Sequence, residues 1–145
     1  MYEKKELGLE ESLKAVNALI QRAGTDGGVP ISAAIVNSEG QLICFARMDP
    51  QTKSLLGIAS NMALKKAYTA ALWKRDTTKV AARMKELECM MSDTFTHDFT
   101  TMQGGVAIVK PGEDAVYGGI GISGRAPEQD EVLANFALQI IQEAL

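Results

Sequence analysis

Residues 104–124 read GGVAIVKPGEDAVYGGIGISG, and this stretch decides the fold. Val106–Val109 and Ala115–Ile122 are rich in β-branched and small residues, and turn-forming residues fill Pro111–Asp114 between them. Two strand-like runs around such a segment predict a β-hairpin.

The pattern outside this stretch extends the prediction to the whole chain. Ile31–Val36 and Leu42–Met48 flank Asn37–Gly40, so a second hairpin is expected. Apolar residues at helical spacing mark four further segments: Gly8–Ala23, Ser54–Trp73, Thr77–Leu87 and Pro127–Leu145. The order α-ββ-αα-ββ-α predicts one α+β domain over residues 1–145, with an antiparallel sheet built from two hairpins and helices packed on it.

Composition excludes several classes of protein. The 145 residues carry a formal net charge of -3, which argues against a nucleic-acid partner because such proteins present basic patches. No apolar run reaches the ~20 residues that cross a bilayer. We therefore expect a cytoplasmic protein that does not bind membranes. Cys44 and Cys89 form no metal-binding spacing, so both are expected to be free thiols and no metal site is assigned.

Gly119–Gly124 spells GxGxxG, the pattern of a dinucleotide-binding loop. That loop needs a strand–helix–strand unit, whereas here a single helix with an acidic start follows the motif. We interpret Gly119 and Gly121 as alternating positions on one face of a strand, where a helix, a partner subunit or a planar ligand approaches closely. Each glycine costs ~0.5–1 kcal/mol relative to alanine, which makes the pair a candidate ligand-binding feature.

The helix expected at Ser54–Trp73 has two apolar faces. Lys66 falls among the apolar side chains of one face, which are Leu55, Leu56, Ala59, Met62, Ala63, Ala70 and Trp73. The second face contains Leu64, Tyr68, Ala71 and Leu72, so we expect cover by the sheet and by another subunit. The pattern favours a Lys66 whose stem packs while its ammonium reaches solvent. Pairing with Asp49 or with a ligand carboxylate is the alternative.

The corner Arg47–Met48–Asp49 ends the first hairpin and is a further candidate site. Alternation along the strand places Arg47 on the face of Ile43 and Phe45, opposite Cys44 and Met48. From there its guanidinium is expected to bind Asp49, Asp130 or an anionic ligand.

His97 is the only histidine and lies in the irregular stretch Cys89–Met102. A lone histidine in a loop is usually solvated, and its alternatives are an axial haem ligand or a general base. No catalytic residue is assigned, because the sequence shows no nucleophile paired with a base. The methionines around this stretch are expected to fill the core or to line an adaptable apolar pocket: Met84, Met90, Met91 and Met102.

Six short runs follow one another along the chain: Val29–Val36, Arg47–Asp49, Lys66–Ala71, Gly104–Val106, Gly118–Gly124 and Glu128–Asp130. Together they resemble the GlcG/HbpS family, which includes the carboxyl-terminal domain of PduO. The resemblance runs from about Leu9 to the carboxyl terminus. It implies an α+β domain with an antiparallel sheet, usually assembled as a homo-oligomer.

Some members of this family bind haem, and one is fused to a corrinoid adenosyltransferase. The first hypothesis is therefore an accessory protein that binds a tetrapyrrole, haem or a corrinoid, and serves cobalamin-dependent diol or glycerol dehydratases. Its expected ligand-binding residues are Arg47, Met48, Asp49, Lys66, Tyr68, Gly119, Gly121 and His97. The alternative is a structural or interaction protein whose role is its homo-oligomer. An enzyme of haem breakdown or small-acid metabolism ranks third.

Overall fold

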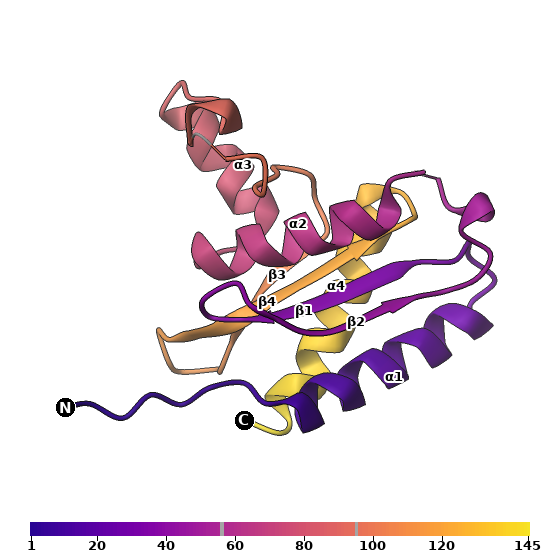
Figure 1. The fold of residues 1–145 in the computed structure, drawn as a ribbon, viewed down its shortest axis with the longest axis horizontal. Coiled ribbons are helices and arrows are strands. Elements are labelled where there is room, and N and C mark those ends of the chain that lie inside the picture. Colours follow the sequence, from indigo (N-terminus) through magenta and orange to yellow (C-terminus); the bar gives the residue numbers. More distant parts are fainter. Residues whose placement is uncertain (56, 95) are drawn as a thin grey trace.

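The computed structural model describes residues 1–55, 57–94 and 96–145 (Figure 1). Its strands are β1 (Ser32–Asn37), β2 (Leu42–Arg47), β3 (Gly105–Val109) and β4 (Val116–Ser123). Its helices are α1 (Leu9–Thr25), α2 (Ala59–Leu72), α3 (Thr77–Glu86) and α4 (Pro127–Gln142), with short 3₁₀ helices η1 (Gln51–Lys53) and η2 (Met91–Thr94). The strands form one antiparallel sheet in the order β2-β1-β4-β3. The predicted α+β class and element order are confirmed.

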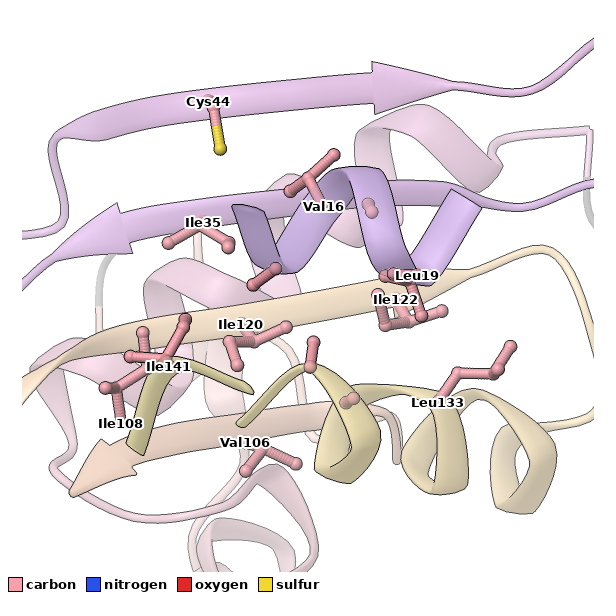
Figure 2. Close-up of a cluster of buried hydrophobic side chains, with 14 of the residues drawn as sticks. Val16, Leu19, Ile35, Cys44, Val106, Ile108, Ile120, Ile122, Leu133 and Ile141 are labelled. Atoms are coloured by element: carbon pink, nitrogen blue, oxygen red, sulfur yellow. The ribbon is translucent and has the colours of Figure 1, made fainter. Parts of the chain in front are cut away.

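The sheet carries helices on both faces (Figure 1). α2 packs on one face, mainly against β4 and β1, whereas α1 and α4 lie side by side on the other. The main core fills the space between the sheet and these two helices (Figure 2). Its largest fully buried members are Leu19, Ile31, Ile35, Ile108, Ile120, Ile122 and Ile141. Isoleucine and valine on the strands suit this packed, pleated surface.

The glycines of β4 let α2 approach the sheet closely. A Cβ at Gly119 would overlap the carbonyl oxygen of Ala67, and one at Gly121 would overlap that of Ala63. The residues of α2 that face these glycines are alanines, so the backbone of the helix packs directly against the backbone of β4. Of the three occupants that the sequence admitted, a helix, a subunit or a planar ligand, the structure places the helix on these glycines.

Three helix ends differ from the prediction by two residues or more, and one of them is the end of α4, which lies at Gln142 rather than Leu145. α1 continues through Gly24 to Thr25, because the Arg125 guanidinium donates to the Ala23 carbonyl at 3.1 Å and stabilises the last turn. α2 begins at Ala59 rather than Ser54, after the separate 3₁₀ turn η1. Leu56, expected on the apolar face of this helix, lies outside the described residues. Among the helices of residues 1–55, 57–94 and 96–145, none is long and apolar enough to cross a membrane.

Candidate functional site

The structure separates the eight predicted ligand-binding residues instead of gathering them into one pocket. Arg47–Asp49 lies at the end of β2, whereas Tyr68 lies beside the turn that precedes β2, where a Cβ at Gly40 would overlap its ring. The length of a six-residue strand, roughly 17 Å, separates these two places. Gly119 and Gly121 lie beneath α2. The predicted residues therefore belong to different regions of the molecule.

At the corner, Arg47 Nη2 donates to Asp49 Oδ1 at 3.3 Å, which confirms one of its expected partners. The pair is exposed, so it contributes at most ~1 kcal/mol and leaves both groups accessible. Met48 packs against the main core, as alternation predicts. The expectation for Ile43 is wrong: a register shift makes it the extra residue opposite β1, and it too packs against that core.

Lys66 is fully buried, so the prediction that its ammonium reaches solvent is wrong. Its Nζ donates to the Ile122 carbonyl at 2.7 Å and to Asp130 Oδ2 at 3.0 Å. The partner of Lys66 is therefore Asp130 rather than Asp49. Because Asp130 is bound to Lys66, it is not the partner of Arg47, which pairs with Asp49 instead. Room for the ammonium comes from Gly104, whose φ is 118° and whose Cβ would lie 2.9 Å from Nζ.

Burial dominates the electrostatics of this pair. Desolvation lowers the pKa of Lys66, and it raises the pKa of Asp130 to about 6 against the opposing pull of the Lys66 charge. The second carboxylate oxygen, Asp130 Oδ1, accepts the Arg125 backbone N–H at 3.1 Å. Both charges thus find partners inside the protein, and the pair joins α2 to the start of α4. In this arrangement Lys66 stabilises the fold and presents no surface to a ligand.

Tyr68 lies in a hollow that we name the hairpin groove, with a volume of about 340 Å³. Its walls are Val36, Gly40, Leu42, Asn61, Leu64, Lys65, Tyr68 and Asp98. The segment that carries His97 and Asp98 is attached to α2 by Phe99, whose ring lies 5.3 Å from Tyr68 and 5.9 Å from Trp73. His97 is exposed, next in sequence to the groove wall.

A second hollow lies between α3 and η2, and we name it the sulfur-lined cavity. Its volume is about 490 Å³, and its walls are Ala81, Met84, Lys85, Cys89, Met90, Met91, Ser92 and Thr101. Of the two roles expected for the methionines, Met84, Met90 and Met91 line a pocket, and core filling is wrong for the exposed Met90. Sequence reasoning missed Cys89, although its position beside Met90 and Met91 was the available signal. Both cysteines are free thiols, as expected.

Within the described ranges, no group of three or more His, Cys, Asp or Glu side chains is placed to hold a metal ion. The two hollows instead combine apolar side chains with several polar or sulfur groups, a mixture found in small-molecule sites.

Comparison with known proteins identifies relatives over almost the full chain. The family model for "Haem degrading protein HbpS-like" matches residues 7–139. The crystal structure of a double mutant of Streptomyces reticuli HbpS superposes with a TM-score of 0.81 at 25% identity, covering 97% of this chain and 90% of that one. The PduOC:heme complex superposes with a TM-score of 0.79 at 27% identity, covering 94% and 95%.

A curated relative comes from Citrobacter freundii, where it is described as an uncharacterized 15.0 kDa protein in the dhaT-dhaS intergenic region. The two sequences are 24% identical over 132 residues, which is 90% of this chain and 89% of the relative. The expected likeness to HbpS and to the carboxyl-terminal domain of PduO is confirmed.

Proposed function

Because this chain belongs to the HbpS-like family, we propose that it is an accessory protein that binds haem. The observation that carries the proposal is the likeness, over 94% of the chain, to a PduOC structure solved as a haem complex. At 27% identity the likeness extends to sequence as well as fold.

The donor groups of the sulfur-lined cavity fit this ligand. Haem iron is held in proteins by histidine, cysteine, methionine or tyrosine side chains. One thiol and three thioethers line this cavity, and its volume of about 490 Å³ falls within the ~300–1,000 Å³ of ordinary ligand pockets. Lys85 on its wall is a cation for a propionate group. We therefore place the haem in the sulfur-lined cavity.

Cys89 is the residue we expect to bind the iron. Its side chain is exposed at the end of α3, where Sγ donates to the Leu87 carbonyl at 3.3 Å. A bound haem would supply an iron atom, and a cysteine thiolate holds that iron in some other haem proteins. The Cys89 thiol would give up its proton to become that ligand, and the methionines would pack against the porphyrin as adaptable apolar walls.

The hairpin groove is the second candidate location, since Tyr68 is a potential iron ligand and Lys65 a cation. Its wall also carries the Asp98 carboxylate, which would repel a propionate. His97, next to Asp98 in sequence, belongs to this alternative.

A hemin titration of three matched variants tests the proposal and the placement together. We expect wild-type protein to give a saturable Soret band with one haem per chain. Cys89→Ser should shift the band and weaken binding by about tenfold or more, which corresponds to ~1.4 kcal/mol. Tyr68→Phe and His97→Ala should bind as wild type. A flat wild-type titration contradicts the function, whereas a changed Tyr68→Phe or His97→Ala spectrum with normal Cys89→Ser binding moves the haem to the hairpin groove.

A corrinoid is the other tetrapyrrole that the family resemblance raises, and cobalamin in the same titration tests it. A saturable change with cobalamin and none with hemin would favour the corrinoid. The link to a cobalamin-dependent dehydratase stays a prediction of the resemblance.

A further inference from the structure

The backbone at the end of α3 folds back in a Schellman motif. The Cys89 N–H donates to the Met84 carbonyl at 3.0 Å. The Glu88 N–H donates to the Lys85 carbonyl at 3.2 Å, and the φ of Glu88 is 54°. In this motif the residue after the left-handed position commonly contacts the residue whose carbonyl it binds. Those two residues are Cys89 and Met84, and both line the sulfur-lined cavity.

The short helix η2 holds two further methionines at the same place. The Asp93 N–H donates to the Met90 carbonyl at 2.9 Å, and the Met90 N–H donates to Asp93 Oδ2 at 2.7 Å. Thr94 Oγ1 donates to the Met91 carbonyl at 2.7 Å. These bonds position the backbone of both methionines directly after Cys89, while their unbranched side chains stay adaptable.

Four sulfur-bearing side chains therefore share one wall: Met84, Cys89, Met90 and Met91. Met84 is 6% exposed and Met90 is 72% exposed, so the set extends from the buried part of the cavity to its mouth. Figure 1 shows α3 and the chain after it projecting beyond the sheet, away from the main core. The Cys89 thiol is free and exposed, so it is accessible to a ligand from solvent.

The rest of the wall limits the kind of ligand. Its other members are Ala81, Lys85, Ser92 and Thr101, so the described lining contains no carboxylate and no imidazole. Hard cations such as Mg²⁺ and Ca²⁺ take oxygen ligands, chiefly carboxylates and carbonyls. Thiolate and thioether sulfur atoms are soft ligands, and they select Cu(I). The donor groups of this cavity therefore fit a soft metal ion.

Charge favours a monovalent ion over a divalent one. A single thiolate carries one negative charge, whereas thioether sulfurs are neutral. Cu(I) bound by Cys89 and methionines is therefore neutral, but a divalent ion on the same groups keeps a positive charge close to the Lys85 ammonium. Zinc is bound in structural sites by four Cys or His side chains, and the described wall supplies one.

We propose that the sulfur-lined cavity binds one Cu(I) ion, with the Cys89 thiolate and the thioethers of Met84 and Met91 as its ligands. Met90, exposed at the mouth, covers the ion. On binding, the S–H bond of Cys89 breaks, a bond between Sγ and copper forms, and the proton passes to solvent. The ion remains Cu(I), so the step consumes no oxidant and no reductant.

This inference goes beyond the proposed function, because it concerns a metal ion and requires no haem. Both ligands use the Cys89 thiolate, so the cavity holds one of them at a time. The two assignments differ in what they require of the methionines. Leucine replaces methionine as an apolar wall for haem at nearly the same volume, but it has no sulfur to bind Cu(I).

Transfer of Cu(I) from the coloured chelator bathocuproine disulfonate tests the site, without oxygen and in the presence of ascorbate. We expect wild-type protein to take up one ion per chain. Loss of a group that only supports a ligand costs metal sites about 10–100-fold in affinity, so Cys89→Ser should weaken binding by about 100-fold or more. Cys44→Ala is the control, since it removes the other free thiol, which lies in the main core.

Matched methionine variants test the thioether ligands. Met84→Leu and Met91→Leu should each weaken Cu(I) binding, and the double variant should weaken it by about tenfold or more. Met62→Leu is the control, because Met62 is 7% exposed, close to the 6% of Met84, but lies in α2. Hemin titrations of the same variants should match wild type, since leucine preserves the apolar wall.

X-ray absorption at the copper edge identifies the ligands directly. We expect sulfur neighbours alone in the copper-loaded wild type. A shell of nitrogen or oxygen atoms would place the ion on other residues. Equimolar Zn²⁺ should leave the bound Cu(I) in place, and displacement by Zn²⁺ would contradict a site selective for soft ions.

Four further results would overturn the proposal. One is a wild-type protein that takes no Cu(I) from the chelator. The second is a Cys89→Ser variant that binds as wild type, and the third is a double methionine variant that does so. The last is one ion per two chains, which would place the copper between the thiols of two copies. The copper titration contains no hemin, so a flat hemin titration rejects the haem proposal and leaves this one unaffected.

Discussion

Gly121 is the position at which a single added methyl group should matter most. Its Cβ would overlap the Ala63 carbonyl oxygen and lie 2.5 Å from the Ala67 nitrogen, both backbone atoms of α2. Overpacking against backbone cannot relax by a rotamer change, so Gly121→Ala should lower the free energy of unfolding by about 3 kcal/mol or more. Gly24→Ala is the control, since nothing lies within 4 Å of its Cβ and it should stabilise α1 by ~0.5 kcal/mol. Urea unfolding measures both, and equal effects would show that α2 is not held against β4.

Lys66 and Asp130 give a second prediction for single residues. Lys66→Met leaves the buried Asp130 carboxylate without its cation, which should cost about 3–5 kcal/mol of unfolding free energy. Lys65→Met, next in the helix but on the groove wall, should change stability by less than ~0.5 kcal/mol. Denaturant titration at pH 7 compares them. The double variant Lys66→Met, Asp130→Asn should recover part of the loss, and no recovery would mean that the two groups are not coupled.

Gly121 and Lys66 also show how much sequence reasoning can predict about the surroundings of a single residue. Periodicity placed Lys66 correctly within an apolar face of its helix. It could not identify Asp130, because the two are 64 residues apart and spacing along a helix carries no information about distant elements. The same limit applies to Gly119 and Gly121: the pattern indicated close approach, but the identity of what approaches is a property of the folded chain.

The cap on β3 gives a prediction at the scale of secondary structure. Asp76 Oδ1 accepts the Ala107 N–H at 3.0 Å on the outer edge of β3, and Asp76→Ala removes this acceptor. Asp76 is also the N-cap residue of α3, but its side chain makes no capping hydrogen bond there. Leaving the Ala107 N–H without its acceptor should cost ~1–2 kcal/mol of unfolding free energy. Amide hydrogen exchange at Ala107 should accelerate, while exchange at the buried Ile35 of β1 stays slow relative to it. Unchanged protection at Ala107 would contradict the role of Asp76 in closing this edge.

The contact between the end of α1 and the segment before α4 predicts a pH dependence. Hydrogen bonds from the Arg125 guanidinium lower the pKa of Asp26 from 3.8. As the pH falls through this range, the unfolded chain takes up the proton first, so the stabilisation by Asp26 is complete above pH ~4 and lost below it. Wild type and Asp26→Asn should therefore differ in unfolding free energy at pH 6 and converge near pH 2. A constant difference over this range would contradict the ion pair.

Sequence reasoning predicted the helices and strands more completely than it predicted the contacts of single residues. Turn residues and alternation located both hairpins, and helical spacing located four helices, because each of these signals is local. The start of α2 was misplaced because the apolar residues after Ser54 keep helical spacing, although η1 ends at Lys53 and α2 begins only at Ala59. The pairing of β1 with β4 joins strands from different hairpins, and no local pattern specifies such a contact. The sulfur-lined cavity depends on the same kind of distant arrangement.

For the whole molecule, the homo-oligomer expected from the family resemblance predicts a thermal midpoint that depends on protein concentration. A partner that binds only the folded state stabilises it by mass action. The midpoint of wild type should rise by a few degrees between about 1 and 100 μM of protein. Differential scanning calorimetry at both concentrations, without hemin, separates this effect from ligand binding. A constant wild-type midpoint would argue against association in this range.

The covered β3 edge also limits how far the sheet can grow by adding strands from other copies. A sheet open at both borders could add copies without end, as fibrils do. Here Asp76, Thr77 and Gln142 already bond the outward backbone groups of β3, so these groups are not available to a strand of another copy. Residues at the start of α3 and the end of α4 thereby prevent polymerisation through the β3 edge.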